Sequence, residues 1–240
     1  MNQAAVIPPE FESILENLKE IQYKTGEALA KYRKPGDKAE IMAVTKTVPP
    51  EKINFAVSQG IVLLGENRVQ EYLSKKDSYD PSAKIHMIGH LQTNKVKYII
   101  KDVEMIQSVD SLKLANEINR LAAANSLVMD VLLEVNIGSE ESKSGVDTNS
   151  LFDLAEQVSQ LHNVRIRGLM AIPPIGAGED TFARMNDLFC ELKEKKLANA
   201  QADVLSMGMS GDYELAVKHG STLVRIGTKL FGARKYMEVK

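Results

Sequence analysis

The stretch IMAVTKTVPP, residues 41–50, contains the most sharply ended strand candidate of this chain. Its apolar first half predicts a β-strand, and the two prolines at its end stop that strand, because proline lacks the N–H group that a sheet requires. Alternation along the strand places Met42, Val44 and Lys46 on one face. The sequence therefore predicts an amine at the carboxyl end of a strand, beside apolar neighbours.

An amine in such surroundings has two interpretations. Apolar neighbours disfavour the ammonium form, which lowers the pKa of the Lys46 amine and makes it available for a Schiff base. Alternatively, Lys46 only ends the strand and extends its amine into water. The choice between them depends on what the rest of the chain places beside this lysine.

Seven more strand candidates follow, separated by segments with helical patterns. They lie at residues 61–65, 85–89, 103–108, 128–135, 164–172, 204–206 and 223–227. Eight strands that alternate with helices predict a parallel sheet, and eight is the number that closes a (β/α)8 TIM barrel. A doubly wound open sheet is the alternative fold. It is less favoured because no Gly-x-Gly-x-x-Gly turn, typical of dinucleotide-binding sheets, follows the first strand.

A helical pattern over about residues 9–34 precedes the first strand, and Pro35-Gly36 ends it. The chain has 240 residues, and α/β barrels of about 250 residues are single units. We therefore expect one α/β barrel domain over residues 1–240 that begins with a lead-in helix.

The composition excludes several classes of partner. Thirty basic and 32 acidic residues leave a formal net charge of -2, so no field of one sign indicates nucleic acid or an acidic membrane surface. The single cysteine, Cys190, lies in an apolar helical pattern and is interpreted as a packing residue in a reducing compartment. No hydrophobic run reaches the ~20 residues of a membrane span. We expect a cytoplasmic monomer that binds neither membrane nor nucleic acid.

Two loops have the composition of a phosphate site. Strand seven leads into SMGMSG at residues 206–211, and strand eight leads into Gly227 and Thr228. TIM barrels commonly bind phosphate with these two loops, because small residues let backbone N–H groups approach the anion. The Ser206 and Thr228 hydroxyls can add hydrogen bonds. The alternative is a pair of ordinary turns in which Ser210 caps a helix.

Arg225 indicates what else the ligand contains. Alternation places Arg225 on the same face of strand eight as Gly227, so a guanidinium lies in the barrel mouth and needs an acceptor. Glu66 or Glu134 can supply that acceptor. The other interpretation is a pyridine nitrogen, because pyridoxal phosphate (PLP) combines a lysine Schiff base, a pyridine ring and a phosphate. In that case Lys46, Arg225 and both loops form one site.

Seven ordered motifs resemble the signatures of the pyridoxal phosphate homeostasis proteins, the YggS/PROSC-type family. They are AVTK (43–46), GENRVQE (65–71), IHMIGHLQTNK (85–95), GSEESKSG (138–145), GLMAIP (168–173), LSMGMS (205–210), and VRIGT (224–228) followed by FGAR (231–234). The resemblance implies a barrel like the alanine racemase domain, PLP held as a lysine Schiff base, and a role in buffering or delivering PLP without substrate turnover.

The resemblance also implies individual roles. Lys46 carries the cofactor, Arg225 faces the pyridine nitrogen, Ser206, Gly227 and Thr228 hold the phosphate, and Asn67 and Met207 line the ring. Neither a catalytic residue nor a metal ligand is expected. One departure is Gly211-Asp212, where many relatives have two acids.

Three residues near the mouth remain outside the predicted site. His90 and Asn136 follow strands three and five. His90 can act as an acid or base or contact the cofactor, but it serves equally well as a loop residue that holds local backbone, and the same holds for Asn136. Lys143 lies in a Ser/Glu/Gly-rich segment that would keep its amine solvated and charged.

Two enzymatic alternatives remain open. A PLP-dependent racemase needs a base on each face of the cofactor. The resemblance implies that alanine racemases take one base from a tyrosine on an appended domain, whereas here Tyr236 and a charged tail follow the last strand. An arginine at the pyridine nitrogen also weakens the ring as an electron sink. A barrel aldolase would use Lys46 on a sugar phosphate. The prediction is a PLP carrier whose partners are PLP and apo PLP-dependent enzymes.

Overall fold

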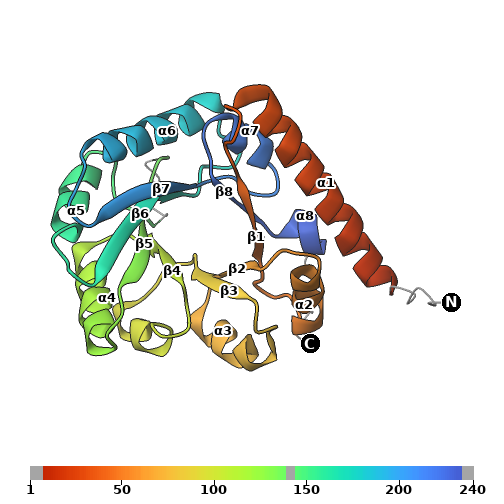
Figure 1. Ribbon diagram of the computed structural model, residues 1–240, viewed down its shortest axis with the longest axis horizontal. Coiled ribbons are helices and arrows are strands. Elements are labelled where there is room, and N and C mark those ends of the chain that lie inside the picture. Colours follow the sequence, from red (N-terminus) through yellow and green to blue (C-terminus); the bar gives the residue numbers. More distant parts are fainter. Residues whose placement is uncertain (1–7, 139–143, 234–240) are drawn as a thin grey trace.

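Parallel strands form a closed barrel in the computed structural model, which describes residues 8–138 and 144–233. The strands follow one another around the barrel in chain order, β1 to β8, and β8 pairs with β1 to close it (Figure 1). They are β1 Glu40–Val44, β2 Leu63–Glu66, β3 Lys84–Met87, β4 Met105–Val109, β5 Met129–Val135, β6 Val164–Ala171, β7 Ala200–Ser206 and β8 Leu223–Ile226. The predicted (β/α)8 barrel is confirmed.

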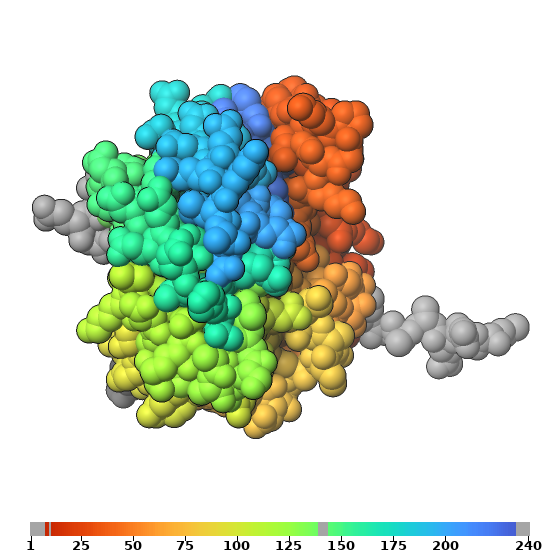
Figure 2. Space-filling model, turned by 60° about the vertical axis from the view of Figure 1, so that its left-hand side comes forward, coloured from red at the N-terminus to blue at the C-terminus, as the bar shows by residue number. Residues whose placement is uncertain are grey.

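Helices cover the outside of the barrel, and in Figure 2 they appear as successive bands of the surface. They are α1 Pro9–Tyr32, α2 Pro50–Ser58, α3 Val69–Lys75, α4 Leu112–Ala124, α5 Leu151–Val158, α6 Glu179–Glu194, α7 Tyr213–Lys218 and α8 Thr228–Phe231, with two 3₁₀ segments, η1 Lys76–Ser78 and η2 Thr93–Tyr98. The predicted lead-in helix is α1. No helix in the described ranges is both long enough and apolar enough to span a bilayer.

The observed strands differ from the predicted ones mainly at their ends. β7 begins at Ala200 rather than at residue 204. Its first half is polar and partly exposed, so it lacks the apolar pattern that predicts a strand. β1 ends at Val44, so Lys46 lies in the turn that follows the strand. That turn is closed by a hydrogen bond from the Val48 N–H to the Thr45 carbonyl oxygen, and α2 begins at Pro50.

The two faces of the strands pack as their alternation predicts. Met42 and Leu223 belong to a small buried cluster inside the barrel, whereas Ala43 and Val224 belong to the large cluster between the sheet and the helices. Both clusters are closed to water, so the barrel interior is a packed core rather than a pore.

The first helix packs against the last one. The Asn17 side chain donates a hydrogen bond to the Leu230 carbonyl oxygen at 3.1 Å, and Lys229 forms an ion pair with Glu20 at 2.8 Å. α8 has four residues, too few for a stable isolated helix, so these contacts support it.

One backbone position within the barrel requires glycine. Gly168 lies where β6 shifts register against both neighbouring strands, its φ is +140°, and an added Cβ would lie 1.9 Å from the Val204 carbonyl oxygen. Gly26 in α1 provides a matched control, because a Cβ there meets no atom within 4 Å.

We expect Gly168→Ala to lower the free energy of unfolding by at least about 2 kcal/mol, because of backbone strain and a steric clash. Gly26→Ala should raise it by about 0.5–1 kcal/mol, since alanine restricts the unfolded chain and favours the helix. Chemical denaturation measures both values. An unchanged stability of Gly168→Ala would contradict the described approach of β6 to β7.

Candidate functional site

A cavity of about 470 Å³ opens at the carboxyl end of the barrel, between the turn after β1 and the start of α8. Its lining consists of Val44, Lys46, Thr47, Val48, Pro49, Lys52, Gly227, Thr228, Phe231, Gly232 and Ala233. Three of the predicted site residues, Lys46, Gly227 and Thr228, therefore meet in one cavity. Lys46 lies 181 residues before Gly227 in the chain, and the pairing of β1 with β8 brings it to Gly227 and Thr228.

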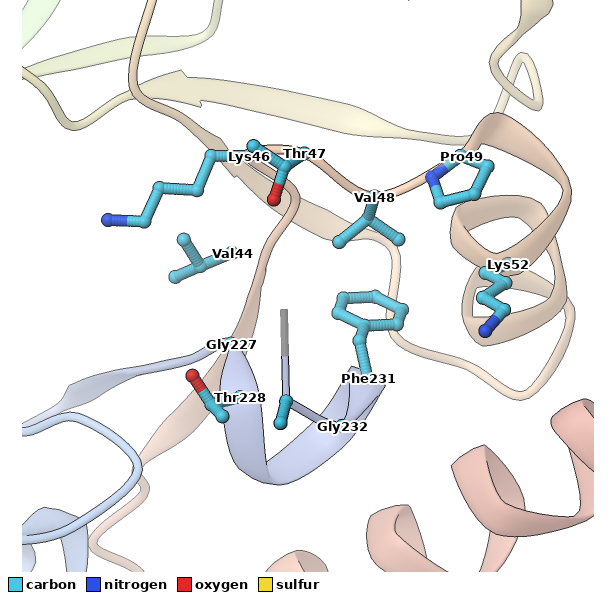
Figure 3. Close-up of a pocket in the computed structure, with 11 residues that line it drawn as sticks. Val44, Lys46, Thr47, Val48, Pro49, Lys52, Gly227, Thr228, Phe231 and Gly232 are labelled. Carbon is cyan, nitrogen blue, oxygen red and sulfur yellow. The ribbon is translucent and has the colours of Figure 1, made fainter. Parts of the chain in front are cut away.

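The cavity has a polar and an apolar side (Figure 3). The Lys46 side chain extends over Val44, and the Thr228 hydroxyl points toward the same side. Val48 and the Phe231 ring face each other on the opposite side. An amine, a hydroxyl and an apolar wall within one hollow suit a ligand that carries both an anionic group and a flat ring.

The loops after β7 and β8 lie against each other, as the prediction of a shared phosphate site requires. The Arg225 N–H donates to the Gly208 carbonyl oxygen at 2.9 Å, and the Lys229 N–H donates to the Ser210 Oγ at 3.1 Å. Ser210 therefore caps the first turn of α8, not the helix that follows it in sequence. The sequence interpretation considered Ser210 only as a local cap and missed this placement beside Thr228.

Ser206 ends β7, as predicted, but its hydroxyl contacts other side chains inside the barrel. Its side chain is fully buried, its hydroxyl donates to the Gln107 Oε1 at 2.7 Å, and it accepts a hydrogen bond from the Arg225 Nη1 at 2.6 Å. A serine hydroxyl has one proton, and Ser206 donates it in the hydrogen bond to Gln107, so none is left to donate to a phosphate. The Ser206 hydroxyl thus binds Gln107 and Arg225 instead of making the expected phosphate contact. β7 continues to Ser206, so alternation turns this side chain inward.

A chain of hydrogen bonds continues from Ser206 through the barrel interior. The Gln107 Nε2 lies 2.9 Å from the His86 Nδ1, and burial lowers the pKa of His86 to about 4. The imidazole is therefore neutral, and its Nδ1 accepts the amide proton. The three hydrogen bonds that join Arg225, Ser206, Gln107 and His86 each have a defined direction, and together they orient these four side chains.

The Arg225 guanidinium is held at two points inside the barrel. Besides Ser206, it donates through Nη2 to the Ala171 carbonyl oxygen at 2.7 Å. Burial lowers the pKa of Arg225 to about 10, while the charges of Glu134 and Asp212 favour its protonated form. The group is charged at neutral pH, and these contacts use two of its five N–H groups.

The two glutamates proposed as partners of Arg225 point in different directions. The Glu66 carboxylate faces the helical layer, where it accepts hydrogen bonds from the Thr45 and Tyr79 hydroxyls, so pairing with Arg225 is excluded. Glu134 faces the interior, and burial raises its pKa to about 7 although the charge of Arg225 opposes this shift. Its Oε2 has no hydrogen-bond partner among the described residues.

A second hollow of about 290 Å³ lies across the mouth. It is lined by Asn67, Ile88, Gly89, His90, Glu134, Asn136, Ser144 and Ile172. The predicted ring contact Asn67 thus lies in the second hollow rather than beside Lys46. The two undecided residues, His90 and Asn136, lie with it.

The remaining predicted contacts are more distant or undescribed. The Met207 side chain is fully buried in the large cluster between sheet and helices, and neither hollow includes it. Residues 139–143, which include Lys143 and most of the GSEESKSG motif, lie outside the described residues, as do Arg234 and Tyr236. Within the described ranges, no group of three acidic, histidine or cysteine side chains could hold a metal ion.

Comparisons with known proteins show the family of this chain. The family model of the alanine racemase N-terminal domain matches residues 17–235. The pyridoxal phosphate homeostasis protein of Aquifex aeolicus is 46% identical over 203 residues, which cover 82% of this chain and 88% of that protein. The protein of the same name from Pasteurella multocida is 38% identical and covers 93% of this chain and 99% of its own.

Solved structures show the same arrangement of the backbone. PipY of Synechococcus elongatus, solved with PLP bound, is 33% identical, has a TM-score of 0.77, and covers 91% of this chain and 100% of its own. The alanine racemase of Corynebacterium glutamicum is 12% identical with a TM-score of 0.69, and the match covers 92% of this chain and 60% of that enzyme. This second likeness concerns the fold alone.

We expect the buried Glu134 to make folding depend on pH between about 5 and 7. Its folded pKa lies above the unfolded one, so it contributes stability at low pH that is lost as pH rises toward 7. Relative to Glu134→Gln, the wild-type protein should lose about 2 kcal/mol of unfolding free energy from pH 5 to pH 7. Urea denaturation of both proteins at the two pH values measures the difference. Parallel pH profiles would contradict the raised pKa.

Proposed function

Because the chain belongs to the family of pyridoxal phosphate homeostasis proteins, we propose that it binds PLP at the mouth of its barrel and takes part in the homeostasis of this cofactor. One observation carries the proposal: the Lys46 amine and the Thr228 hydroxyl share one side of a cavity that also has an apolar wall. The volume of about 470 Å³ lies within the range of small-molecule sites.

The residues present suit the chemistry of PLP. When bound, PLP supplies an aldehyde whose carbon forms a C=N bond to a primary amine as its oxygen leaves as water. Lys46 offers that amine at the edge of the cavity. Gly227 and Thr228 offer a closely approachable backbone and a hydroxyl to a phosphate, and Ser210 lies beside them at the start of α8.

The other predicted residues take roles that follow from their positions. Arg225 would face the ring nitrogen of bound PLP, as the resemblance implies, and Ser206 would act through Arg225 by holding its guanidinium. Asn67 approaches from the second hollow across the mouth. Met207 remains a prediction from the resemblance, since its side chain packs away from both hollows.

Arg225 also favours a carrier over a racemase. Its pKa of about 10 keeps the guanidinium charged, so it donates a proton to a ring nitrogen in a hydrogen bond but does not transfer one. An unprotonated ring withdraws electrons less strongly, which slows loss of a proton from a bound amino acid. Arg225 thus binds the ring and limits turnover. The family name supports the same conclusion.

The proposal includes the biological setting expected from the composition. The protein acts as one domain over residues 1–240, as a monomer in the cytoplasm, and passes PLP to apo PLP-dependent enzymes. The match to homeostasis proteins over 93% of this chain supports the single domain and the handling of PLP.

Borohydride reduction of the protein loaded with PLP should place the covalent adduct on Lys46. Lys52 lines the same cavity but points away from Thr228 in Figure 3, so it provides a matched control. Lys46→Ala should abolish the adduct, and Lys52→Ala should retain it. Peptide mapping by mass spectrometry measures both results. An adduct on Lys52 in the wild-type protein would show that Lys46 is not the lysine that binds PLP.

The loaded protein should transfer PLP without converting alanine enantiomers above the rate of a blank. Incubation with an apo PLP-dependent enzyme should restore the activity of that enzyme, because the cofactor is held reversibly. A dialysis membrane between the two proteins distinguishes release into solution from transfer on contact. Steady racemisation that disappears in Lys46→Ala would instead establish the enzyme interpretation.

A further inference from the structure

Two acids of the GENRVQE motif have no part in the cavity, yet both bind the residues that flank Lys46. Glu66 ends β2, and Glu71 lies in the first turn of α3. Neither lines the hollow that contains Lys46. Both acids contact the turn after β1 on its side toward the helical layer, away from the cavity.

Glu66 holds the residue before the lysine. Its side chain is fully buried, and its Oε1 lies 2.6 Å from the Thr45 Oγ1, which is also fully buried. The Gly65 carbonyl oxygen lies 3.1 Å from the same hydroxyl, so the single proton of Thr45 goes to the nearer and more basic Glu66. The Tyr79 hydroxyl donates to the same carboxylate oxygen.

Glu71 holds the residue after the lysine. Its Oε1 accepts the Thr47 backbone N–H at 2.5 Å and pairs with the Lys75 ammonium at 2.5 Å. Lys75 in turn donates to the Thr45 carbonyl oxygen at 3.1 Å. One ion pair on α3 therefore binds the backbone on both sides of Lys46.

The backbone between these contacts is strained. Thr47 has a φ of +62°, and a β-branched residue adopts this left-handed conformation only when its surroundings impose it. The hydrogen bond from its N–H to Glu71 is such a constraint. Lys46, the residue before Thr47, extends over Val44 toward the side where Thr228 lies.

We propose that Glu66 and Glu71 are positioning residues that hold Thr45 and Thr47 so that the Lys46 amine is presented toward Gly227 and Thr228. This inference rests on the proposed function, because it concerns the same lysine. Pre-organisation of the amine accelerates its reaction with the aldehyde and leaves the phosphate contacts unchanged. The two effects can be measured separately.

The test compares PLP with pyridoxamine 5′-phosphate, which has an amine in place of the aldehyde and cannot condense with Lys46. Glu71→Met removes the acceptor at similar side-chain volume, whereas Glu71→Gln keeps an acceptor oxygen. Glu51→Met is the matched control, because Glu51 is an exposed acid in the first turn of α2. Thr45→Val removes the donor to Glu66 and provides a second, independent variant.

We expect Glu71→Met and Thr45→Val to slow formation of the covalent adduct by about tenfold to a hundredfold. The visible absorbance of the adduct measures this rate. The affinity for pyridoxamine 5′-phosphate should stay within about twofold in both variants, and Glu71→Gln and Glu51→Met should react at nearly the wild-type rate. Circular dichroism and thermal unfolding identify any variant that fails to fold.

Three outcomes overturn the inference or its premise. Wild-type rates in both Glu71→Met and Thr45→Val would show that neither contact positions the amine. An equal loss of affinity for pyridoxamine 5′-phosphate would show that the contacts support the cavity as a whole, not Lys46 in particular. Absence of an adduct in the wild-type protein would instead contradict the proposed function itself.

Discussion

A charged guanidinium buried inside a closed barrel constrains much of the surrounding structure. Arg225 is only 3% exposed, and an unpaired charge at such a depth would cost several kcal/mol. The barrel meets this requirement with the Ala171 carbonyl oxygen and with Ser206, whose proton must then go to Gln107. Since Gln107 also donates to a neutral His86, one charge near the mouth is connected by hydrogen bonds to polar side chains on three other strands.

Closure of the sheet makes the site possible. Lys46 follows the first strand and Thr228 follows the last, so in an open sheet with the same strand order they would lie at opposite edges. The pairing of Met42 with Arg225 joins these edges and brings both residues to one cavity. The loop after β7 then packs beside them through Ser210. The site is therefore a property of the complete barrel.

Much of this could be predicted from the sequence, because periodicity, strand-ending prolines and glycine-rich loops are local signals. All eight strands and the inward position of Arg225 follow from them, whereas Lys46 lies in the turn beyond β1 rather than on a face of the strand. The contacts of Ser206 and Ser210 did not follow from these signals, because they depend on which side chains of β4, β8 and α8 lie beside these serines in the folded barrel. The roles of Glu66 and Glu71 were also hidden, since they depend on how α3 lies against the turn after β1.

The contacts of α1 and β1 have a consequence for synthesis of the protein. Asn17 binds the carbonyl group of Leu230, 213 residues later in the chain, and β1 pairs with β8. During translation the first helix and strand emerge long before these partners exist. The apolar face of α1, which includes Ile14, Leu18 and Ile21, thus remains incompletely covered on the ribosome until the last strand has left the exit tunnel. Although α1 is made early, it is therefore among the last elements of the barrel to complete its packing.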